Sequence, residues 1–587
     1  MTTMHVRPGR TAFVLAALAA LVGGCVSIPD DGTVQTVEGG RPQQVSPARI
    51  RPAGPVTDAA PTEIVNGFLQ AMMSSPVRYD IARRFLTEGA SDDWSPRASV
   101  TVYSQTSVSE GDTPAVGASV DVDLAREAVL TAQGRFTVPD SREQHLGLTL
   151  VQEDEQWRIA DPPQGALISQ SFFESYYDPL NLYFFDSAGT QLVAAPVHLP
   201  DDTGRATYLV SSLLMGPQGV LGGQARTFLP ETWVLARPVE IDDEGVAVVR
   251  FAGSDSGLSL DDRQRLSAQL VASLRQIPTI TGVEIRVGDR PLSLPSTPDV
   301  QRLDTWNQYD PAADRSSQQL FAMREGTLYV VGRASTSPFA GAWGTDPVRS
   351  EDFRVSLDAE RIALVTDGRR VVRVSPLAGE PELTAVRQGT NLLRPSWDAG
   401  GRLWTIDRTA TGSVLTVGPT DKPPRSVDLG ILATGQVTGF ELSPDEARVV
   451  ATARVGGRDG LYVGAIRYDE EGTPVGLVDV AEIPVPADTG VPVSAAWRSS
   501  TSLAVLARAQ QRVPQVSIVA IDSSTPVTGA VRVGLFPQDG AIQVLGPGQP
   551  TAPLYVLDTE GGLWTQTADG RWKQTGDDPV DVAAFPG

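Results

Sequence analysis

Apolar positions between residues 61 and 165 first recur with the period of a helix and then alternate as they do in strands. The helical spacing runs through Ile64 and Phe68, and a second short helix is expected around Phe85. The strands that follow are expected at 99–104, 118–124, 133–138, 144–153 and 156–159. Helices followed by a run of antiparallel strands predict an α+β domain, able to curl round a pocket.

Residues 178–295 alternate between strand and helix patterns. A helix over 207–215 is expected to end at Gly216-Pro217, because Gly is favoured just past a helix end and Pro cannot continue a helix. A second helix is expected after Ser259, where the sequence resembles a capping box. The predicted strands lie at 181–186, 246–251 and 283–287. This alternation predicts a compact α/β domain.

From about residue 315 to the end, the helical period disappears and short strands follow one another at regular intervals. Turn residues Asp358, Asp398, Asp445 and Ser499 each precede a strand, and they are 40, 47 and 54 residues apart. This is the spacing of propeller blades, which are about 40 to 50 residues long. With further units at 326–330 and 554–565, residues 315–587 predict an all-β propeller of about six blades, with residues 580–585 as a candidate closing strand.

The repeated carboxylates invite comparison with the catalytic pair of a glycosidase. Because they recur at the same place in each blade, a structural role in the turn is the favoured interpretation. Trp404, Trp497 and Trp564 lie within predicted strands, so we expect them to be core residues rather than platforms for sugars.

The first 25 residues predict export and lipidation. A basic segment precedes an apolar stretch over 11–22, and Val22-Gly23-Gly24-Cys25 contains the only cysteine in the chain. The twelve apolar residues would span only about 18 Å at 1.5 Å per residue, too little for a bilayer core of about 30 Å. The pattern resembles the bacterial lipobox, which implies a signal peptide at 1–24 and lipidation at Cys25; a secretory signal cut elsewhere is the alternative. Polar and Pro-rich residues 25–60 then predict a tether.

Charge and composition narrow the function. The net charge of -22 disfavours nucleic acid and anionic lipid surfaces as partners, so we expect the acyl anchor to hold the body at the outer face of the cell membrane. Beyond the signal only His145 and His198 remain, and in 253–257 Asp255 stands where a nucleophile elbow needs serine. No catalytic, cofactor-binding or metal residue is assigned, and we expect the protein not to be an enzyme.

Three regions of the chain resemble known domains. The order of elements in 61–165, with the strand at Trp157-Arg158-Ile159, is similar to the NTF2-like fold. Residues 178–295 resemble the GerMN domain of spore-germination proteins, a binding or scaffolding unit. The motifs that carry this second resemblance are Leu182-Tyr183-Phe184-Phe185, Leu213-Leu214-Met215-Gly216-Pro217, Phe228-Leu229-Pro230 and Ala268-Gln269-Leu270-Val271 to Gly282-Val283. The blade turns resemble those of TolB.

Lipobox, tether, NTF2-like region, GerMN domain and propeller, in this order, resemble the LpqB lipoproteins of actinobacteria. The resemblance implies a partner, the extracytoplasmic domain of an MtrB-like sensor kinase, and a role in envelope homeostasis and division through the MtrA-MtrB two-component system. An envelope hydrolase or glycan-binding lipoprotein is the alternative. A deep pocket gathering carboxylates and aromatic side chains from several blades would favour that alternative, and a broad shallow face would favour a protein partner.

Overall fold

The computed structural model describes residues 49–587, except 113–116, 312–317, 333–334, 486–489, 509–513, 526–530, 536–539, 568–570 and 577. Signal, lipidation site and most of the tether predicted from the sequence therefore lie outside the described residues.

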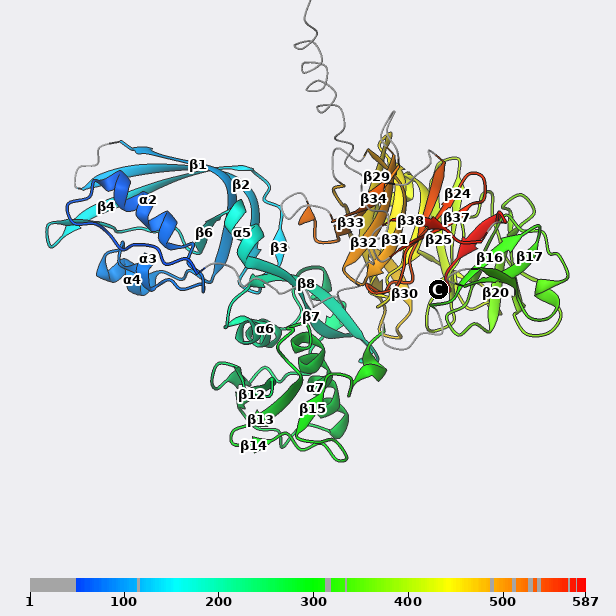
Figure 1. Cartoon of the computed structure of the whole chain (residues 1–587), viewed down its shortest axis with the longest axis horizontal. Coiled ribbons are helices and arrows are strands. Elements are labelled where there is room, and N and C mark those ends of the chain that lie inside the picture. The colour runs from blue at the N-terminus through cyan, green and yellow to red at the C-terminus, as the bar shows by residue number, and fades with distance from the viewer. Residues whose placement is uncertain are drawn as a thin grey trace, which may run out of the picture. The chain divides into compact units, whose positions relative to one another are not determined.

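The first domain is a curved, mostly antiparallel sheet with helices against one face (Figure 1). The sheet order is β5-β4-β2-β1-β6, and β6 runs parallel to β1. The apolar side of α2 packs on the sheet and buries Ile64, Val65 and Phe68. The elements are α2 (Pro61–Ala71), α3 (Asp80–Arg83), α4 (Glu88–Asp93), β1 (Ser99–Glu110), β2 (Ala118–Thr131), β3 (Phe136–Thr137), β4 (Glu143–Glu153), β5 (Gln156–Ile159) and β6 (Ala166–Ser169). The α+β prediction is confirmed.

The second domain follows α5 (Gln170–Tyr176) and is built around a parallel pair of strands, β12 and β13, joined by α7. A separate sheet, ordered β8-β7-β9, packs beside α7, and both sheets share one apolar core. The elements are β7 (Tyr177–Asp186), β8 (Leu192–Pro200), α6 (Arg205–Leu214), β9 (Ala225–Arg226), β10 (Val234–Leu235), β11 (Glu240–Ile241), β12 (Val246–Ala252), α7 (Leu260–Leu274), β13 (Gly282–Val287), β14 (Arg290–Pro291) and β15 (Val300–Arg302).

Both predicted helix boundaries of this α/β domain are confirmed. The Ser259 hydroxyl accepts a hydrogen bond from the Asp262 N–H and caps α7. Gly216 follows α6 with φ of +72°, a left-handed conformation in which a side chain is strained. The hydrophobic period and the cap residues therefore set these helices, and α7 is then buried along most of its length.

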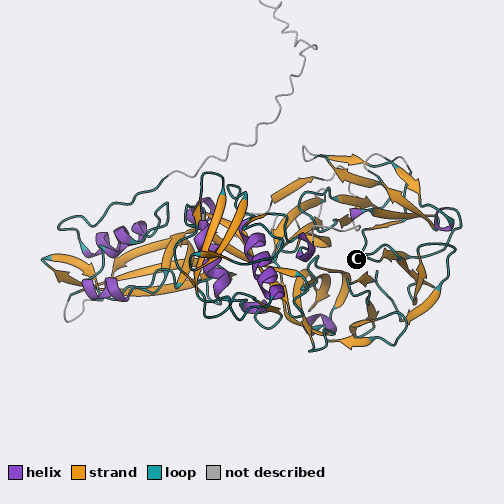
Figure 2. Cartoon of the chain, turned by 90° about the horizontal axis from the view of Figure 1, so that it is seen from below, coloured by secondary structure: helices purple, strands orange, loops and turns teal. Residues whose placement is uncertain are grey.

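The remaining chain forms six four-stranded sheets, set radially about a common centre (Figure 2). In blade 1 the innermost strand is the last strand of the chain, β39, which pairs with β16 through Phe321 and Ala584. This pairing closes the ring and confirms both the number of blades and the closing strand predicted from the sequence. Blade 1 comprises β39 (Val582–Ala584), β16 (Leu320–Arg324), β17 (Thr327–Val331) and β18 (Thr336–Pro338).

The other five blades run in chain order from the innermost strand outwards. They are blade 2, β19 (Asp352–Val355), β20 (Arg361–Thr366), β21 (Val371–Pro376) and β22 (Thr384–Gln388); blade 3, β23 (Ser396–Trp397), β24 (Leu403–Thr409), β25 (Gly412–Gly418) and β26 (Arg425–Val427); blade 4, β27 (Gln436–Leu442), β28 (Arg448–Val455), β29 (Arg458–Tyr468) and β30 (Pro474–Glu482); blade 5, β31 (Val491–Ser499), β32 (Ser502–Arg508), β33 (Gln515–Ala520) and β34 (Val531–Leu535); and blade 6, β35 (Ala541–Leu545), β36 (Tyr555–Asp558), β37 (Leu563–Gln566) and β38 (Trp572–Gln574).

The repeated Asp residues act in the turns, as predicted. Asp358 accepts from the Glu360 N–H at 3.0 Å, and Asp445 accepts from the Ser443 hydroxyl at 2.6 Å. Asp398 accepts from the Arg402 N–H and from the Trp404 indole N–H, both at 2.9 Å. These bonds satisfy turn donors next to the innermost strands and leave the carboxylates occupied within the fold.

The predicted core role holds for two of the three tryptophans. Trp404 and Trp497 are 1% and 2% exposed. Trp564 is only half-buried, because it lies on β37, the third strand of blade 6, towards the rim of the propeller. Its indole N–H donates to Asp558 at 2.8 Å, six residues earlier, as Trp404 does to Asp398.

Candidate interaction site at the centre of the propeller

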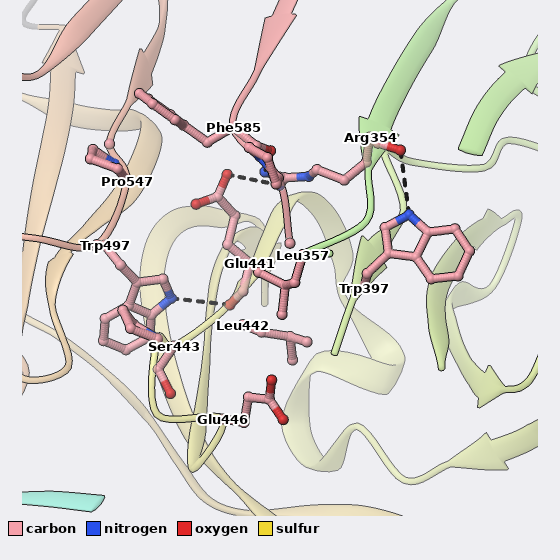
Figure 3. Close-up of a pocket in the computed structure, with 15 residues that line it drawn as sticks. Arg354, Leu357, Trp397, Glu441, Leu442, Ser443, Glu446, Trp497, Pro547 and Phe585 are labelled. Atoms are coloured by element: carbon pink, nitrogen blue, oxygen red, sulfur yellow. Dashed lines mark hydrogen bonds and ion pairs between the residues drawn. The ribbon is translucent and has the colours of Figure 1, made fainter. Parts of the chain in front are cut away.

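A small cavity of about 60 Å³ lies where the innermost strands of blades 2 to 5 end (Figure 3). Its walls come from five blades and from the end of the chain. The lining residues are Arg354, Leu357, Trp397, Glu441, Leu442, Ser443, Pro444, Glu446, Trp497, Gly546, Pro547, Gly548, Phe585, Pro586 and Gly587. Most of these residues are apolar or glycine, and two carboxylates and one guanidinium provide the charges.

An ion pair crosses the cavity floor. Arg354 of β19 donates to a carboxylate oxygen of Glu441 on β27 at 3.1 Å, and the two side chains are only 6% and 19% exposed. Arg354 also donates to the backbone oxygen of Phe585 at 3.0 Å, and so contacts the closing strand's end. Burial lowers the pKa of Arg354, and the charge of Glu441 opposes that shift. The pair therefore joins blades 2 and 4 across the axis.

The two tryptophans of the cavity are held by backbone hydrogen bonds to the preceding blade. The Trp397 indole N–H donates to the Arg354 carbonyl, and the Trp497 indole N–H donates to the Glu441 carbonyl, both at 3.3 Å. The Arg361 guanidinium lies 4.5 Å from the centre of the Trp397 ring and covers one of its faces. These contacts fix the orientation of both indoles, and their polar atoms serve the fold.

The rim of the cavity is fixed as well. Glu446 accepts from the Ala399 N–H at 2.6 Å, which joins the turns of blades 3 and 4. Arg498, next to Trp497, donates to the carbonyls of Gln549, Pro550 and Ala552 and so holds the loop that contains Pro547. Burial lowers the pKa of Arg498. The cavity is therefore a preformed feature of the ring.

Size limits what this cavity can bind. Ligand pockets for small organic molecules are typically about 300–1,000 Å³, several times larger. Aromatic and acidic side chains from several blades do meet at this cavity, which is the feature that would favour a glycan site. However, the space admits no more than the end of one side chain or a few water molecules. The cavity is therefore smaller than a typical pocket for a sugar unit.

The second domain docks beside the cavity, on the turn of blade 4. Asp445, whose first oxygen holds the turn, uses its second oxygen to accept from the Ala194 N–H of β8 at 3.2 Å. Arg448 donates to the Ala194 carbonyl at 2.9 Å. Strand β8 is at the edge of its sheet, so these two side chains complete hydrogen bonds that an edge strand otherwise leaves open. The recurrence of Asp in the blade turns predicted only the turn role of Asp445, and not this contact with the second domain.

Histidines lie at two unrelated places. His198 on β8 is buried, and its Nε2 atom lies 2.9 Å from Asp522 in the loop after β33, while its ring contacts Phe136 and Phe173. Burial raises the pKa of Asp522, but hydrogen bonds to His198 and Ser524 outweigh burial and leave it below its usual value. His145 is exposed on the first domain's sheet, where a hydrogen bond to Asp123 raises its pKa. His198 thus joins all three domains.

Three further features concern metal binding, the serines on either side of Asp255, and membrane-spanning helices. In the described ranges no group of three or more His, Cys, Asp or Glu side chains is placed to hold a metal ion. Ser254 and Ser256, beside Asp255, bond to each other at 3.0 Å, and the Ser254 carbonyl accepts from Trp233. Among the described helices none is long and apolar enough to cross a membrane.

Comparison with known families covers most of the chain in three consecutive matches. Residues 54–174 match the family model of the lipoprotein LpqB N-terminal domain, residues 181–293 match the sporulation and spore germination (Germane) domain, and residues 326–586 match the lipoprotein LpqB beta-propeller domain. Proteins of this class are envelope-associated lipoproteins that contain several domains, one of them a β-propeller.

Relatives match over nearly their whole length. Lipoprotein LpqB of Cutibacterium acnes is 27% identical over 97% of this chain and 98% of its own, and that of Thermobifida fusca is 29% identical over 94% and 97%. Among solved structures, TolB from Acinetobacter baumannii aligns with 60% of this chain and 98% of its own at 15% identity and a TM-score of 0.34. The first GerMN domain of GerM from Bacillus subtilis aligns with 21% and 97% at 21% identity and 0.18. This chain belongs to the LpqB family of actinobacterial lipoproteins.

Proposed function

We propose that this chain is a lipid-anchored, extracytoplasmic interaction protein that binds and modulates an MtrB-type sensor kinase. Its anchor is the lipidated Cys25, and its role is regulatory rather than catalytic. Modulation requires that the chain bind one conformational state of the kinase more tightly than the other, because equal affinity would shift no equilibrium.

One observation carries the proposal: the propeller face that holds the cavity is also the face on which the second domain docks. Asp445 and Arg448 bond strand β8 to the turn of blade 4, and the neighbouring turn residues Ser443, Pro444 and Glu446 line the cavity, so the second domain lies next to it. A composite surface of this kind suits recognition of another protein, which needs a broad, preformed area. Membership of a lipoprotein family adds that the surface is displayed at the envelope.

The chemistry of the propeller supports an interaction role. The repeated carboxylates Asp358, Asp398 and Asp445 accept hydrogen bonds from their own turns, and the indole N–H groups of the cavity bond to backbone carbonyls. A glycosidase needs two carboxyl groups facing a sugar-sized space. The cavity offers Glu441 and Glu446, but Glu441 is already paired with Arg354 and the space is small.

The test is binding of the full lipidated chain, held in lipid nanodiscs, to the purified extracytoplasmic domain of the partner kinase. Empty nanodiscs and a nanodisc with an unrelated lipoprotein serve as controls. Saturable binding specific to this chain, with a Kd at or below roughly 10 μM, supports the proposal, since weak signalling contacts have affinities of that order. Absence of saturable binding at ten times that concentration overturns it and turns attention to cell-wall glycans.

A further inference from the structure

The carboxylate of Glu441 is only half used. One of its oxygens accepts from Arg354, and the other points away from the guanidinium (Figure 3). No other described residue donates to this carboxylate through its side chain or backbone. A carboxylate can accept about four hydrogen bonds, so the second oxygen retains capacity for a donor that enters the cavity.

Arg354 is already bonded to three acceptors, which use three of its five N–H groups. Its terminal nitrogens donate to Glu441 and to the Phe585 carbonyl, and its Nε atom donates to the Pro395 carbonyl at 3.4 Å. The side chains that line the cavity therefore include one guanidinium, held by three acceptors, and two carboxylates, those of Glu441 and Glu446. These side chains sum to one negative charge, so an entering anion would meet repulsion.

The walls favour a flat cation in particular. Trp397 and Trp497 flank Leu442, and the apolar surface continues through Pro547 and Phe585. Both indoles are 2% exposed or less, so an entering group meets mainly the partly exposed side chains of Leu442 and Pro547. A planar, weakly hydrated guanidinium can lie on such an apolar surface while its N–H groups reach a carboxylate. An ammonium group would be more strongly hydrated and would lose more on entering an apolar cavity. A space of about 60 Å³ takes the end of one such side chain.

We infer that this cavity receives a single arginine side chain of a partner protein. The guanidinium donates to the second oxygen of Glu441 and lies against Leu442 and Pro547, next to Trp497, while the partner's backbone lies over the blade turns. The inference rests on the proposed function for the identity of the partner, but the chemistry of the cavity can be tested without the kinase.

The first arm uses N-acetyl-arginine amide as the probe and the full chain in detergent micelles, with 15N-labelled tryptophan indoles observed by NMR. Trp497→Phe assigns its indole signal. The expected result is a saturable shift of the Trp497 signal with a Kd of about 1 mM, the affinity appropriate to one side chain. N-acetyl-citrulline amide, which has nearly the same shape and no charge, should give a shift at least tenfold weaker.

The second arm uses Glu441→Gln, which keeps an acceptor for Arg354 and removes the negative charge. Glu380→Gln is the matched control, because Glu380 is exposed on the loop between β21 and β22 of blade 2. We expect Glu441→Gln to abolish the shift caused by the arginine probe and to weaken kinase binding at least tenfold, with Glu380→Gln unchanged in both.

The outcomes separate the two proposals. No shift with the arginine probe, an equal shift with citrulline, or an unchanged shift in Glu441→Gln overturns the inference whatever the kinase does. Kinase binding that is equal for wild type and Glu441→Gln also overturns it, and leaves the proposed function intact. Failure of the wild-type chain to bind the kinase removes the proposed function, and the probe alone then decides the chemistry of the cavity.

Discussion

The ion pair across the propeller axis leads to the most demanding prediction. Arg354→Met removes a guanidinium that is 6% exposed and leaves Glu441 and the Phe585 carbonyl without their partner. Removing one member of a buried pair costs about 3–5 kcal/mol, and the 19% exposure of Glu441 places this site near 3 kcal/mol because water recovers part of the loss. For a unit of this size the melting temperature of the propeller falls by roughly 6 °C.

Replacing both charges should restore most of the loss. In Arg354→Met with Glu441→Leu, no unpaired charge remains, and an apolar pair of similar volume is often as stable as a buried ion pair. The double variant should therefore be within about 1 kcal/mol of wild type, with a coupling energy of at least about 2 kcal/mol. Arg454→Met is the matched control: Arg454 pairs with Asp459 at 2.7 Å on an exposed hairpin, where solvent screens the pair, so its loss should cost far less than that of Arg354.

The assay is hydrogen exchange of the innermost strands β19 and β27, which reports the opening free energy of these strands without assuming that the whole chain unfolds in one step. The reasoning is refuted if Arg354→Met costs no more than Arg454→Met, or if the effects of Arg354→Met and Glu441→Leu simply add in the double variant.

Three further predictions follow from the contacts described above. Asp398→Ala leaves two N–H donors of Arg402 and the Trp404 indole N–H without an acceptor, and should cost about 3 kcal/mol. Asp358→Ala removes a more exposed acceptor and should cost about 1 kcal/mol. Hydrogen exchange in blades 3 and 2 measures both costs, and equal costs would contradict the assigned turn role. The folded pKa of Asp522 lies below the unfolded value of 3.8, so its contribution to docking is present above pH 3.8 and is lost as the pH falls through the folded pKa. Limited proteolysis of wild type should therefore show the contact between Asp522 and His198 opening under acid. Asp522→Asn should remove this pH dependence. Cys25→Ser should move the chain from the membrane fraction to the soluble fraction, and retention of that variant in the membrane would contradict lipidation at this residue.

Elements whose apolar residues pack into the core could be predicted from the sequence, whatever their length. The short strand β5 (Gln156–Ile159) and the capped helix α7 were both predicted closely. The helix α4 has the sequence Glu88-Gly-Ala-Ser-Asp-Asp93 and no buried residue, so no hydrophobic period marks it. The strand β6 pairs with β1 across more than 60 residues of chain, and such pairing leaves no local signal.

The blade repeat could be predicted, but the centre of the propeller could not. Arg354 and Glu441 are 87 residues apart and meet only because the ring closes. One signal was present: each stands two residues before the turn serine of its blade, at Ser356 and Ser443, which places both on innermost strands. The second role of Asp445, at the docked second domain, depends on contacts between domains and could not be inferred from a repeat within one domain.

Regulation of a sensor kinase can be measured as kinase autophosphorylation in proteoliposomes. The full-length kinase is reconstituted with the lipidated chain, with Glu380→Gln and Glu441→Gln variants beside it. A ligand that prefers one kinase state by 1–3 kcal/mol changes the equilibrium constant between the two states by about fivefold or more. The wild-type chain and Glu380→Gln should therefore change the autophosphorylation rate severalfold when the preferred state is the minor one, and Glu441→Gln should change it much less. An autophosphorylation rate that the wild-type chain leaves unchanged at saturating concentration would contradict the account.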